Sequence, residues 1–314
     1  MKTLEKTELS QFTTMRIGGV ADRICLPSTT DELINLMDSL MSTNEPWSLV
    51  GGGSNILVSS YDIPGTVICT TGMNWIEQPG PDLLIAGAGV RLPRLSAYAA
   101  KLSLSGMEFF EGIPGTVGGA VVMNAGAHGS YTSRILETVT VLNLKKQKIE
   151  VLTPKDIVFG YRISSVNPQE QIVLGAKFRM SPDTEAAIRT RMKANNLARQ
   201  STQPIKDPNA GCTFVNPIEL NMSAGKLLDS IGAKNWKVGS AQVSSIHANF
   251  IINLGNANSQ DVCKLMTKLQ EAVYEKYNIL LKPEIKPLGV FKESETIIWT
   301  NADQTLKSSF IITK

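Results

Sequence analysis

The spacing of apolar residues predicts helices in several parts of the chain. Apolar side chains recur three or four positions apart at Leu33, Leu36, Met37 and Leu40, and again at Val262, Leu265, Met266, Leu269 and Val273. Each set therefore lies on one face of a helix, and we expect helices over residues 28–41 and 259–278. Thr29 and Glu32 have the spacing of a capping box at the start of the first helix.

Other helices are indicated by their starts and by their polarity. Residues 92–104 are expected to form a helix with Pro93 near its beginning. Residues 181–200 open with Ser-Pro and are strongly polar, which is typical of a helix that connects two domains. A short helix is expected over 223–234.

Short apolar runs between turn residues predict strands. They lie at 45–55, 65–70, 82–89, 247–255 and 279–289, and residues 136–154 predict a hairpin with its turn around Lys146–Gln147. In the tail, the runs "TIIWT" (296–300) and "SFIIT" (309–313) also suggest strands. The alternation of helices and strands indicates a mixed α and β protein.

Composition and charge remove several classes of function. Of the 314 residues, 42% are hydrophobic and 19% charged, which is typical of a globular protein with one large or two smaller domains. The net charge of +3 and the lack of a basic block give no support for a nucleic-acid partner. Without an apolar leader or a long apolar run, we expect a cytoplasmic protein that does not bind a membrane.

Cysteine and histidine usage limits the possible chemistry. Cys25, Cys69, Cys212 and Cys263 are widely spaced, which favours free thiols over disulfides. With only two histidines, a three-histidine zinc site is impossible, and we expect no metal. Catalysis would then depend on other side chains or on an organic cofactor.

Three glycine-rich stretches stand in the first half, at 16–19, 50–55 and 112–120. In "VGGGSN" (50–55), consecutive glycines allow positive φ and close approach of a ligand, and successive N–H groups can form an anion nest. Glycine-rich turns without a ligand are common. The stretch "GIPGTVGGA" (112–120) favours a bound ligand, because two walls of bare backbone suit an extended dinucleotide.

Eight motifs then occur in a fixed order over roughly residues 10–290. They are "TTMRIGG", "GGGSNILV", "EGIPGTVGGAVVMNAGAHG", "YRISS", "AGCTFVNP", "AGKLLDSIG", "HANFIIN" and "LKPEIKPLG". This series resembles the UDP-N-acetylenolpyruvoylglucosamine reductase family, flavoenzymes of bacterial peptidoglycan precursor synthesis. The short connection after residues 177–180 resembles the short-loop (type II) form of that family.

The resemblance implies an α+β fold with two domains. It places an FAD-binding domain of the vanillyl-alcohol-oxidase (PCMH) type at 1–180, divided into subdomains near 60–70. A linking helix (181–200), a smaller α+β substrate-binding domain (201–290) and a C-terminal extension of unassigned role (291–314) follow. A monomer is expected.

The resemblance also implies a set of cofactor-binding residues and noncovalent attachment of FAD, since neither loop has a histidine or cysteine that matches a covalent site. NADPH would be the reductant. The implied FAD contacts are Arg16, Gly51, Gly52, Gly53, Ser54, Asn55, Gly112, Ile113, Pro114, Gly115, Gly118, Gly119 and Asn124.

The implied reaction reduces the enolpyruvyl group of UDP-N-acetylglucosamine enolpyruvate. Such chemistry needs a polarising group near the carboxylate and a proton donor for the enolate. By match to the motifs, Arg162 and Glu284 are the polarising pair and Cys212 is the donor. Taken singly, Arg162 is typical of a salt-bridged residue at a strand end and Glu284 of an exposed edge strand.

Cys212 departs from the commoner family pattern, which has serine at this position. A thiol is mostly protonated at neutral pH and is a stronger acid than an alcohol, so it can donate a proton. The alternative is a buried, inert cysteine that fills a small space. The expected substrate contacts are Tyr161, Gln203, Asn216 and His247, the last being equally consistent with a structural role.

Two other functions remain open at this point. One is an FAD-dependent oxidase or dehydrogenase of a hydroxy acid, although the basic residue that it usually needs near the flavin is not evident. The other is a catalytically silent FAD- or nucleotide-binding protein. Reduction of the flavin by NADPH, followed by reoxidation by the enolpyruvyl substrate, would separate the three.

Overall fold

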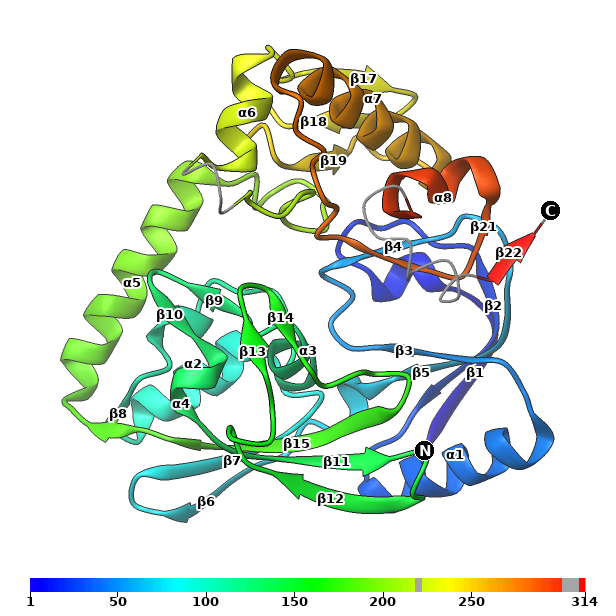
Figure 1. Ribbon diagram of the computed structural model, residues 1–314. Coiled ribbons are helices and arrows are strands. Elements are labelled where there is room, and N and C mark those ends of the chain that lie inside the picture. Colours follow the sequence, from blue (N-terminus) through cyan, green and yellow to red (C-terminus); the bar gives the residue numbers. More distant parts are fainter. Residues whose placement is uncertain (218–221, 301–310, 314) are drawn as a thin grey trace. The chain divides into compact units, whose positions relative to one another are not determined.

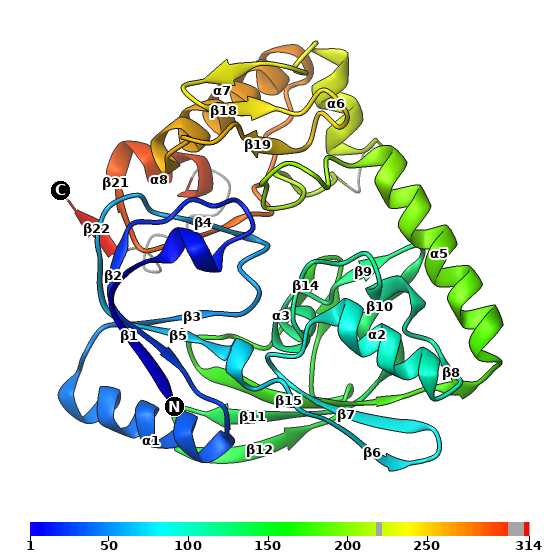
Figure 2. The ribbon, with the colours of Figure 1, turned by 180° about the vertical axis from the view of Figure 1, so that it is seen from behind.

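The computed structural model describes residues 1–217, 222–300 and 311–313. The chain forms two compact units, which are discontinuous in sequence. Unit 1 contains residues 1–3, 24–52 and 67–199, and unit 2 contains residues 4–23, 53–66 and 200–314. Figure 1 and Figure 2 show the elements of both.

The main sheet of unit 1 is antiparallel and has five strands in the order β12-β11-β15-β7-β6 (Figure 1). Its strands are β6 (Ile76–Gly80), β7 (Leu83–Gly87), β11 (Leu136–Asn143), β12 (Lys148–Leu152) and β15 (Gln171–Arg179). β11 and β12 form the predicted hairpin, with Gln147 at a φ of +49° in its turn. The prediction of this hairpin is confirmed.

Both faces of β15 are covered, which explains its almost continuous apolar run. Val173 and Phe178 belong to a core with residues of helices α2 (Leu92–Lys101) and α3 (Val117–Val122). Ile172 and Leu174 point to the other core, where α1 (Thr30–Thr43) packs. Successive strand side chains point to opposite faces, so a strand between two helical layers must be apolar on both. Figure 2 shows α2 and α3 above the sheet.

α1 begins as the sequence predicts, but only half of the predicted capping box forms. Thr29 is the N-cap, and its hydroxyl accepts a hydrogen bond from Glu32 N–H at 3.1 Å. The Glu32 carboxylate bonds instead to the backbone N–H and hydroxyl of Ser28 and to the amino terminus. These three donors hold the pKa of Glu32 at about 2.

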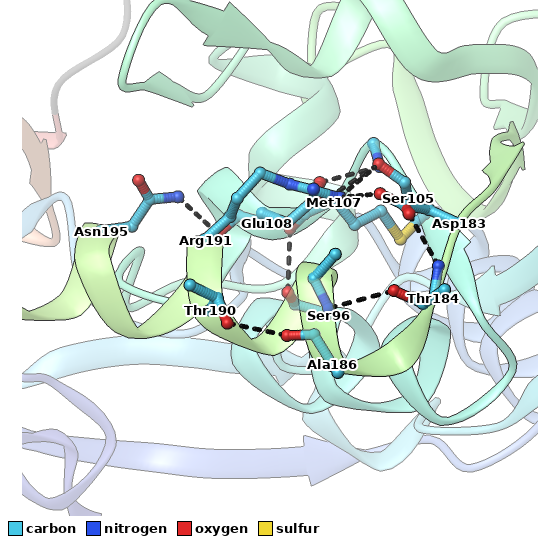
Figure 3. A network of polar contacts seen from close by, with 12 residues as sticks. Ser96, Ser105, Met107, Glu108, Asp183, Thr184, Ala186, Thr190, Arg191 and Asn195 are labelled. Carbon is cyan, nitrogen blue, oxygen red and sulfur yellow. Dashed lines mark hydrogen bonds and ion pairs between the residues drawn. The ribbon is translucent and has the colours of Figure 1, made fainter.

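The predicted polar helix, α5 (Glu185–Thr202), is anchored on unit 1 through a network of charged side chains (Figure 3). Arg191 donates to Glu108 at 2.7 Å and to Asp183 at 2.6 Å, and Asn195 donates to the Glu108 carbonyl at 3.1 Å. Burial alone would raise the pKa of Glu108, but these and neighbouring hydrogen bonds lower it overall. The helix is therefore more than a solvated linker, since one face is fixed.

Unit 2 is built around α7 (Ser259–Tyr277), whose apolar face lies in a core with residues of α6 (Ala224–Ser230) and α8 (Glu293–Thr300). Its sheet has three antiparallel strands in the order β17-β18-β19. These are β17 (Lys237–Val238), β18 (Ala241–Val243) and β19 (Ile251–Asn253). Asn258 caps α7 in a full capping box with Asp261.

The remaining elements are short or join segments that are distant in sequence. β1 (Lys2–Glu8), β2 (Val20–Leu26), β5 (Ile63–Cys69) and β3 (Trp47–Val50) form a sheet in that order. β20 (Lys286–Leu288) is parallel to β4 (Ile56–Val58), and β21 (Val290–Lys292) is parallel to β22 (Ile311–Thr313). The small antiparallel pairs are β8 (Leu104–Ser105) with β16 (Ser181–Pro182), β9 (Gly126–Ala127) with β10 (Ser130–Tyr131), and β13 (Phe159–Gly160) with β14 (Ile163–Ser164). The single turns are α4 (Thr132–Ile135), η1 (Leu9–Phe12), η2 (Thr70–Gly72) and η3 (Glu108–Phe110).

Two sequence-based expectations are corrected, and a third, a strand within 309–313, is confirmed for its described residues. Residues 296–300 are helical, within α8, because Ile298 and Trp299 both pack into the core around α7. Of 309–313, residues 309 and 310 lie outside the described residues, and 311–313 form β22. The strand expected over 247–255 is limited to β19.

The compact units also divide the chain differently from the predicted domains. The predicted domains, 1–180 and 201–290, follow the family resemblance along the chain, whereas the compact units group residues by their spatial contacts. Residues 4–23 and 53–66 instead belong to unit 2, where β4 pairs with β20 across more than two hundred residues. Strand pairing over such a separation leaves no trace in local composition.

Candidate functional site

In unit 1, Gly51 and Gly52 of the glycine-rich stretch 50–55 lie against the glycine-rich stretch 112–120. A Cβ added to Gly52 would stand 3.2 Å from Gly115 Cα and 3.1 Å from Arg91 Nη1, and one added to Gly51 would stand 2.7 Å from Thr116 Oγ1. Side chains would fill this space, so the two backbone walls need glycine. Thr116 Oγ1 is buried and has no hydrogen-bond partner within the described part of the chain. A buried hydroxyl beside bare backbone suits a polar ligand atom, and these residues therefore fit a dinucleotide cofactor.

The second stretch continues into α3, which rests on the loop before α2. Gly118 N–H donates to the Ala88 carbonyl at 2.9 Å, and an added Cβ would lie 3.2 Å from Ala88 Cβ. Gly119 and Pro114 are exposed. Gly112 lies beside the Arg199 side chain, and Ile113 packs against the core of the sheet.

The loop after α3 is held by Asn124. Its φ is +41°, its amide donates to the Gly160 carbonyl at 3.0 Å, and its side-chain oxygen accepts from Ser133 N–H at 3.0 Å. These bonds join the end of the glycine-rich region to the β13–β14 hairpin. Asn124 was expected to line the cofactor; in the structure its side chain first serves to hold the hairpin.

That hairpin presents Arg162. Tyr161 and Arg162 form its turn between β13 and β14, and Arg162 has a φ of +60°, an uncommon conformation for a side chain of this type. Its guanidinium donates to the Gly126 carbonyl at 2.9 Å and lies 5.6 Å from the centre of the Tyr161 ring. Ser164 donates to the Val122 carbonyl at 2.9 Å. Arg162 is therefore fixed beside the segment that follows the glycine-rich walls.

In unit 2, Gly53 begins the other half of the first glycine stretch. Its φ is +64°, and an added Cβ would lie 2.0 Å from the Phe12 carbonyl oxygen. The Gly53 carbonyl accepts hydrogen bonds from both the N–H and the hydroxyl of Thr14. Arg16, two residues after Thr14, is exposed. The Asn253 side chain donates to the Met15 and Arg16 carbonyls. Ser54, which follows Gly53 in the chain, is half-buried.

Asn55 connects this stretch to Glu284. Its amide donates to the Glu284 carbonyl at 3.2 Å, and its own carbonyl accepts from Lys286 N–H at 3.0 Å. The expectation for Asn55 was a contact with cofactor phosphate. The structure adds a second role, because the same side chain fixes the backbone of a predicted catalytic residue.

Cys212 lies in a loop that is shaped by Asn209. The Asn209 side chain accepts from Gly211 N–H at 2.9 Å and donates to the Pro204 and Asp207 carbonyls. Gly211 has a φ of +80°, which bends the chain just before the cysteine. Cys212 is half-buried, in contrast to Cys263, whose thiol is enclosed and has its pKa raised by burial. Partial exposure and a fixed loop are compatible with a reacting thiol.

Asn249 supports the residues that follow Cys212, and sequence reasoning missed it. Its carbonyl accepts from Thr213 N–H at 2.8 Å, its side-chain oxygen accepts from Phe214 N–H at 2.9 Å, and its amide donates to the Phe214 carbonyl at 2.8 Å. The side chain is 2% exposed. The first asparagine of the motif "HANFIIN" was the available signal, and it does not reveal a partner 35 positions away.

The segment that contains Glu284 pairs with the loop of Cys212 just before β20 begins at Lys286. Glu284 N–H donates to the Thr213 carbonyl at 2.8 Å, and Val215 N–H donates to the Lys282 carbonyl at 2.9 Å. Phe214 and Pro283 form an antiparallel bridge between these bonds. Glu284 is only 9% exposed, so the idea of a merely exposed edge carboxylate is wrong. The structure thus places two of the three predicted catalytic residues, Cys212 and Glu284, on two segments of unit 2 that are hydrogen-bonded to each other.

The residues expected to contact the substrate have different surroundings. The Asn216 side chain accepts from Ala224 N–H at 3.0 Å, at the start of α6. Gln203 Oε1 is buried and has no hydrogen-bond partner among the described residues. His247 accepts from Asn249 N–H at 3.1 Å through Nδ1 and packs edge-on against Phe250. Burial lowers the pKa of His247, with a smaller contribution from Lys234.

Comparisons with known proteins agree with this architecture. Residues 21–151 match the model of an FAD binding domain, and residues 203–288 match the C-terminal domain of UDP-N-acetylenolpyruvoylglucosamine reductase. The reductase of Prochlorococcus marinus (strain MIT 9313) is 38% identical over 90% of this chain and 92% of its own. That of Caldicellulosiruptor saccharolyticus is 39% identical over 92% and 93%. The crystal structure of the Thermus caldophilus reductase matches with a TM-score of 0.77, at 34% identity over 91% of this chain and 98% of that one.

The fold and the glycine-rich walls thus define an FAD-dependent oxidoreductase, with an α+β FAD-binding domain and a second α+β domain. The chain belongs to the UDP-N-acetylenolpyruvoylglucosamine reductase family. Within residues 1–217, 222–300 and 311–313, no helix is both long and apolar enough to cross a membrane.

Proposed function

We propose that the chain reduces UDP-N-acetylglucosamine enolpyruvate to UDP-N-acetylmuramate, with NADPH as the reductant. Family membership supports the reaction class. When bound, FAD would supply hydride chemistry, taking a hydride from NADPH for the vinyl methylene carbon of the substrate. The observation that carries the assignment of residues is the backbone hydrogen bond between Thr213 and Glu284, which joins the loop of Cys212 to the segment that contains Glu284.

Cys212 is the proposed proton donor. After hydride addition, the carbon next to the substrate carboxylate carries the electron pair, and the Sγ–H bond of Cys212 breaks to deliver a proton there. The resulting thiolate recovers a proton from water. Asn209 and Asn249 hold the loop on either side of Cys212, so the thiol needs little reorganisation to act.

Arg162 and Glu284 are the proposed polarising groups. The guanidinium of Arg162 is a fork of N–H donors that matches a carboxylate, and the backbone of Arg162 has an uncommon conformation, so the group can be directed at the developing carboxylate anion. Glu284 is largely buried, with both its N–H and its carbonyl bound to neighbouring residues. These two bonds fix the backbone from which the carboxylate extends.

The cofactor would be held without a covalent bond by the glycine-rich walls. Gly51, Gly52 and Gly115 offer bare backbone in unit 1, and Thr116 adds a buried hydroxyl without a protein partner among the described residues. Gly53, Ser54 and Asn55 offer backbone N–H groups in unit 2. We propose Tyr161, Gln203, Asn216 and His247 as contacts of the sugar nucleotide, and expect a cytoplasmic monomer.

The test separates flavin reduction from substrate reduction. In the Cys212→Ala variant, NADPH should still bleach the visible absorbance of the flavin, while reoxidation by the enolpyruvyl substrate falls by about 10²- to 10⁴-fold, the usual contribution of a general acid. Cys212→Ser should retain activity and serves as the matched control. Undiminished reoxidation in Cys212→Ala would refute the role of Cys212.

The same assay examines the other two functions. A protein that binds FAD but is not bleached by NADPH would be a silent binder. Reoxidation by oxygen at a rate comparable to that with the enolpyruvyl substrate would indicate an oxidase. Either result would refute the proposed reaction itself, independently of the role of any one residue.

A further inference from the structure

The C-terminal segment after the family match has no assigned role. The match to the reductase C-terminal domain ends at residue 288, and β21 and α8 follow it. α8 lies against α7 in unit 2 (Figure 1). Its buried residues include Ile298 and Trp299, at 0% and 1% exposure. A segment with this much buried apolar surface is part of the fold of unit 2.

Trp299 reaches the segment 281–285, which contains Glu284. Its indole Nε1–H donates to the Ile285 carbonyl at 2.8 Å, and Ile285 directly follows Glu284. The indole also packs edge-on against Phe291, with 5.6 Å between ring centres. Because the carbonyl is buried, it depends on this donor. The position of Ile285 is thereby coupled to α8.

Gln270 of α7 holds the other end of the same segment. Its amide, on a side chain 4% exposed, donates to the Leu281 carbonyl at 2.6 Å and to the Ile298 carbonyl at 3.3 Å. One side chain thus joins the start of the segment 281–285 to the end of α8. Glu284 lies between two carbonyls that are each held by a buried donor.

The apolar core also connects α8 to the residues that follow Cys212. Phe214, two residues after Cys212, belongs to the same buried cluster as Ile285, Ile298 and Trp299. Phe214 is also bridged to Pro283. The extension therefore completes the core that supports both the segment 281–285 and the loop of Cys212.

We propose that α8 is a positioning element for Glu284 and that Trp299 is its positioning residue. The indole fixes the Ile285 carbonyl, the carbonyl fixes the backbone of residues 281–285, and that backbone sets the direction of the Glu284 carboxylate. This inference rests on the proposed role of Glu284 in substrate reduction. It predicts that Trp299 affects substrate reduction and leaves the reduction of the flavin by NADPH unchanged.

The first test is the full-length Trp299→Phe variant, which keeps an aromatic ring and removes the donor. We expect reoxidation of the reduced flavin by the enolpyruvyl substrate to slow by about 10- to 10²-fold, the range for a small misplacement of a reacting group. Flavin reduction by NADPH and affinity for FAD should stay within about twofold of the unsubstituted protein. Trp236→Phe is the matched control, because Trp236 packs against the same core beneath Lys268 and should change neither half-reaction.

The second test is a double-variant cycle with Glu284→Gln. If Trp299 acts through Glu284, adding Trp299→Phe to Glu284→Gln should cause no further slowing of reoxidation. A further slowing as large as in the single variant would overturn the proposal, and so would an equal loss in both half-reactions. If Glu284→Gln alone reoxidises at the normal rate, the role of Glu284 in the proposed function fails, and this inference fails with it.

A second variant covers the case in which Trp299→Phe does not fold. Gln270→Met keeps the length of the side chain and removes the donor to the Leu281 and Ile298 carbonyls. It should give the same selective slowing of reoxidation and the same lack of additivity with Glu284→Gln. Normal reoxidation in a folded Gln270→Met protein would overturn the proposal that the held segment positions Glu284.

Discussion

The Asn249→Ala substitution tests most directly whether Asn249 supports the residues that follow Cys212. It removes the acceptor for Phe214 N–H and the donor to the Phe214 carbonyl, which bond to Asn249 at 2.9 and 2.8 Å. Phe214 is 0% exposed, so water cannot easily replace either bond. Each buried backbone group left without a partner costs about 1–3 kcal/mol, which gives a destabilisation of about 2–6 kcal/mol for the two.

The effect can be measured by urea unfolding of the full-length protein, followed by tryptophan fluorescence. Asn256→Ala is the matched control, since Asn256 is exposed in a turn of the same unit and its removal should change the free energy of unfolding by no more than about 0.5 kcal/mol. Where Asn249→Ala still folds, reoxidation of the flavin by substrate should slow more than its reduction by NADPH. A loss of stability no larger than that of Asn256→Ala would refute the role of Asn249.

Two further predictions concern the cofactor walls and the pH dependence of stability. Gly52→Val should abolish retention of FAD during purification, because even the first side-chain carbon would meet Gly115 Cα at 3.2 Å, whereas Gly80→Ala, with only ordinary contacts, should retain it. The folded-state pKa of His247 is lowered from 6.5 by burial, so the unfolded chain binds a proton more readily. The stability that this histidine contributes is present above pH 6.5 and is lost as the pH falls through the folded-state pKa, and His247→Gln should flatten that part of a pH series of urea unfolding curves.

Each of these predictions has an outcome that contradicts it. Full FAD content in Gly52→Val would show that the gap between the two glycine-rich stretches is not the binding wall. An unchanged loss of stability below pH 6.5 in His247→Gln would assign that loss to other groups.

Much of the local structure is determined by short-range patterns. The helices at residues 30–43 and 259–277 follow from apolar periodicity, the helix at 92–101 follows from the proline near its start, and the hairpin at 136–152 follows from its apolar runs and turn. These elements depend on side chains three or four positions apart, or on a turn of a few residues, so one sequence is enough to predict them. The family and its set of cofactor residues were recognisable for a different reason, because eight motifs occur in order.

The sequence by itself therefore determined the elements, the glycine-rich walls and the three catalytic candidates Arg162, Cys212 and Glu284. Only the tertiary structure decided how they are supported. Asn249 braces Phe214 from 35 positions away, and Asn55 bonds to Glu284 from 229 positions away. Residues 296–300 read as a strand because of their β-branched residues, yet burial of Trp299 against the core makes them helical. Such contacts form only when distant segments meet, since the free energy of a buried hydrogen bond or an apolar contact depends on the partner and not on chain neighbours.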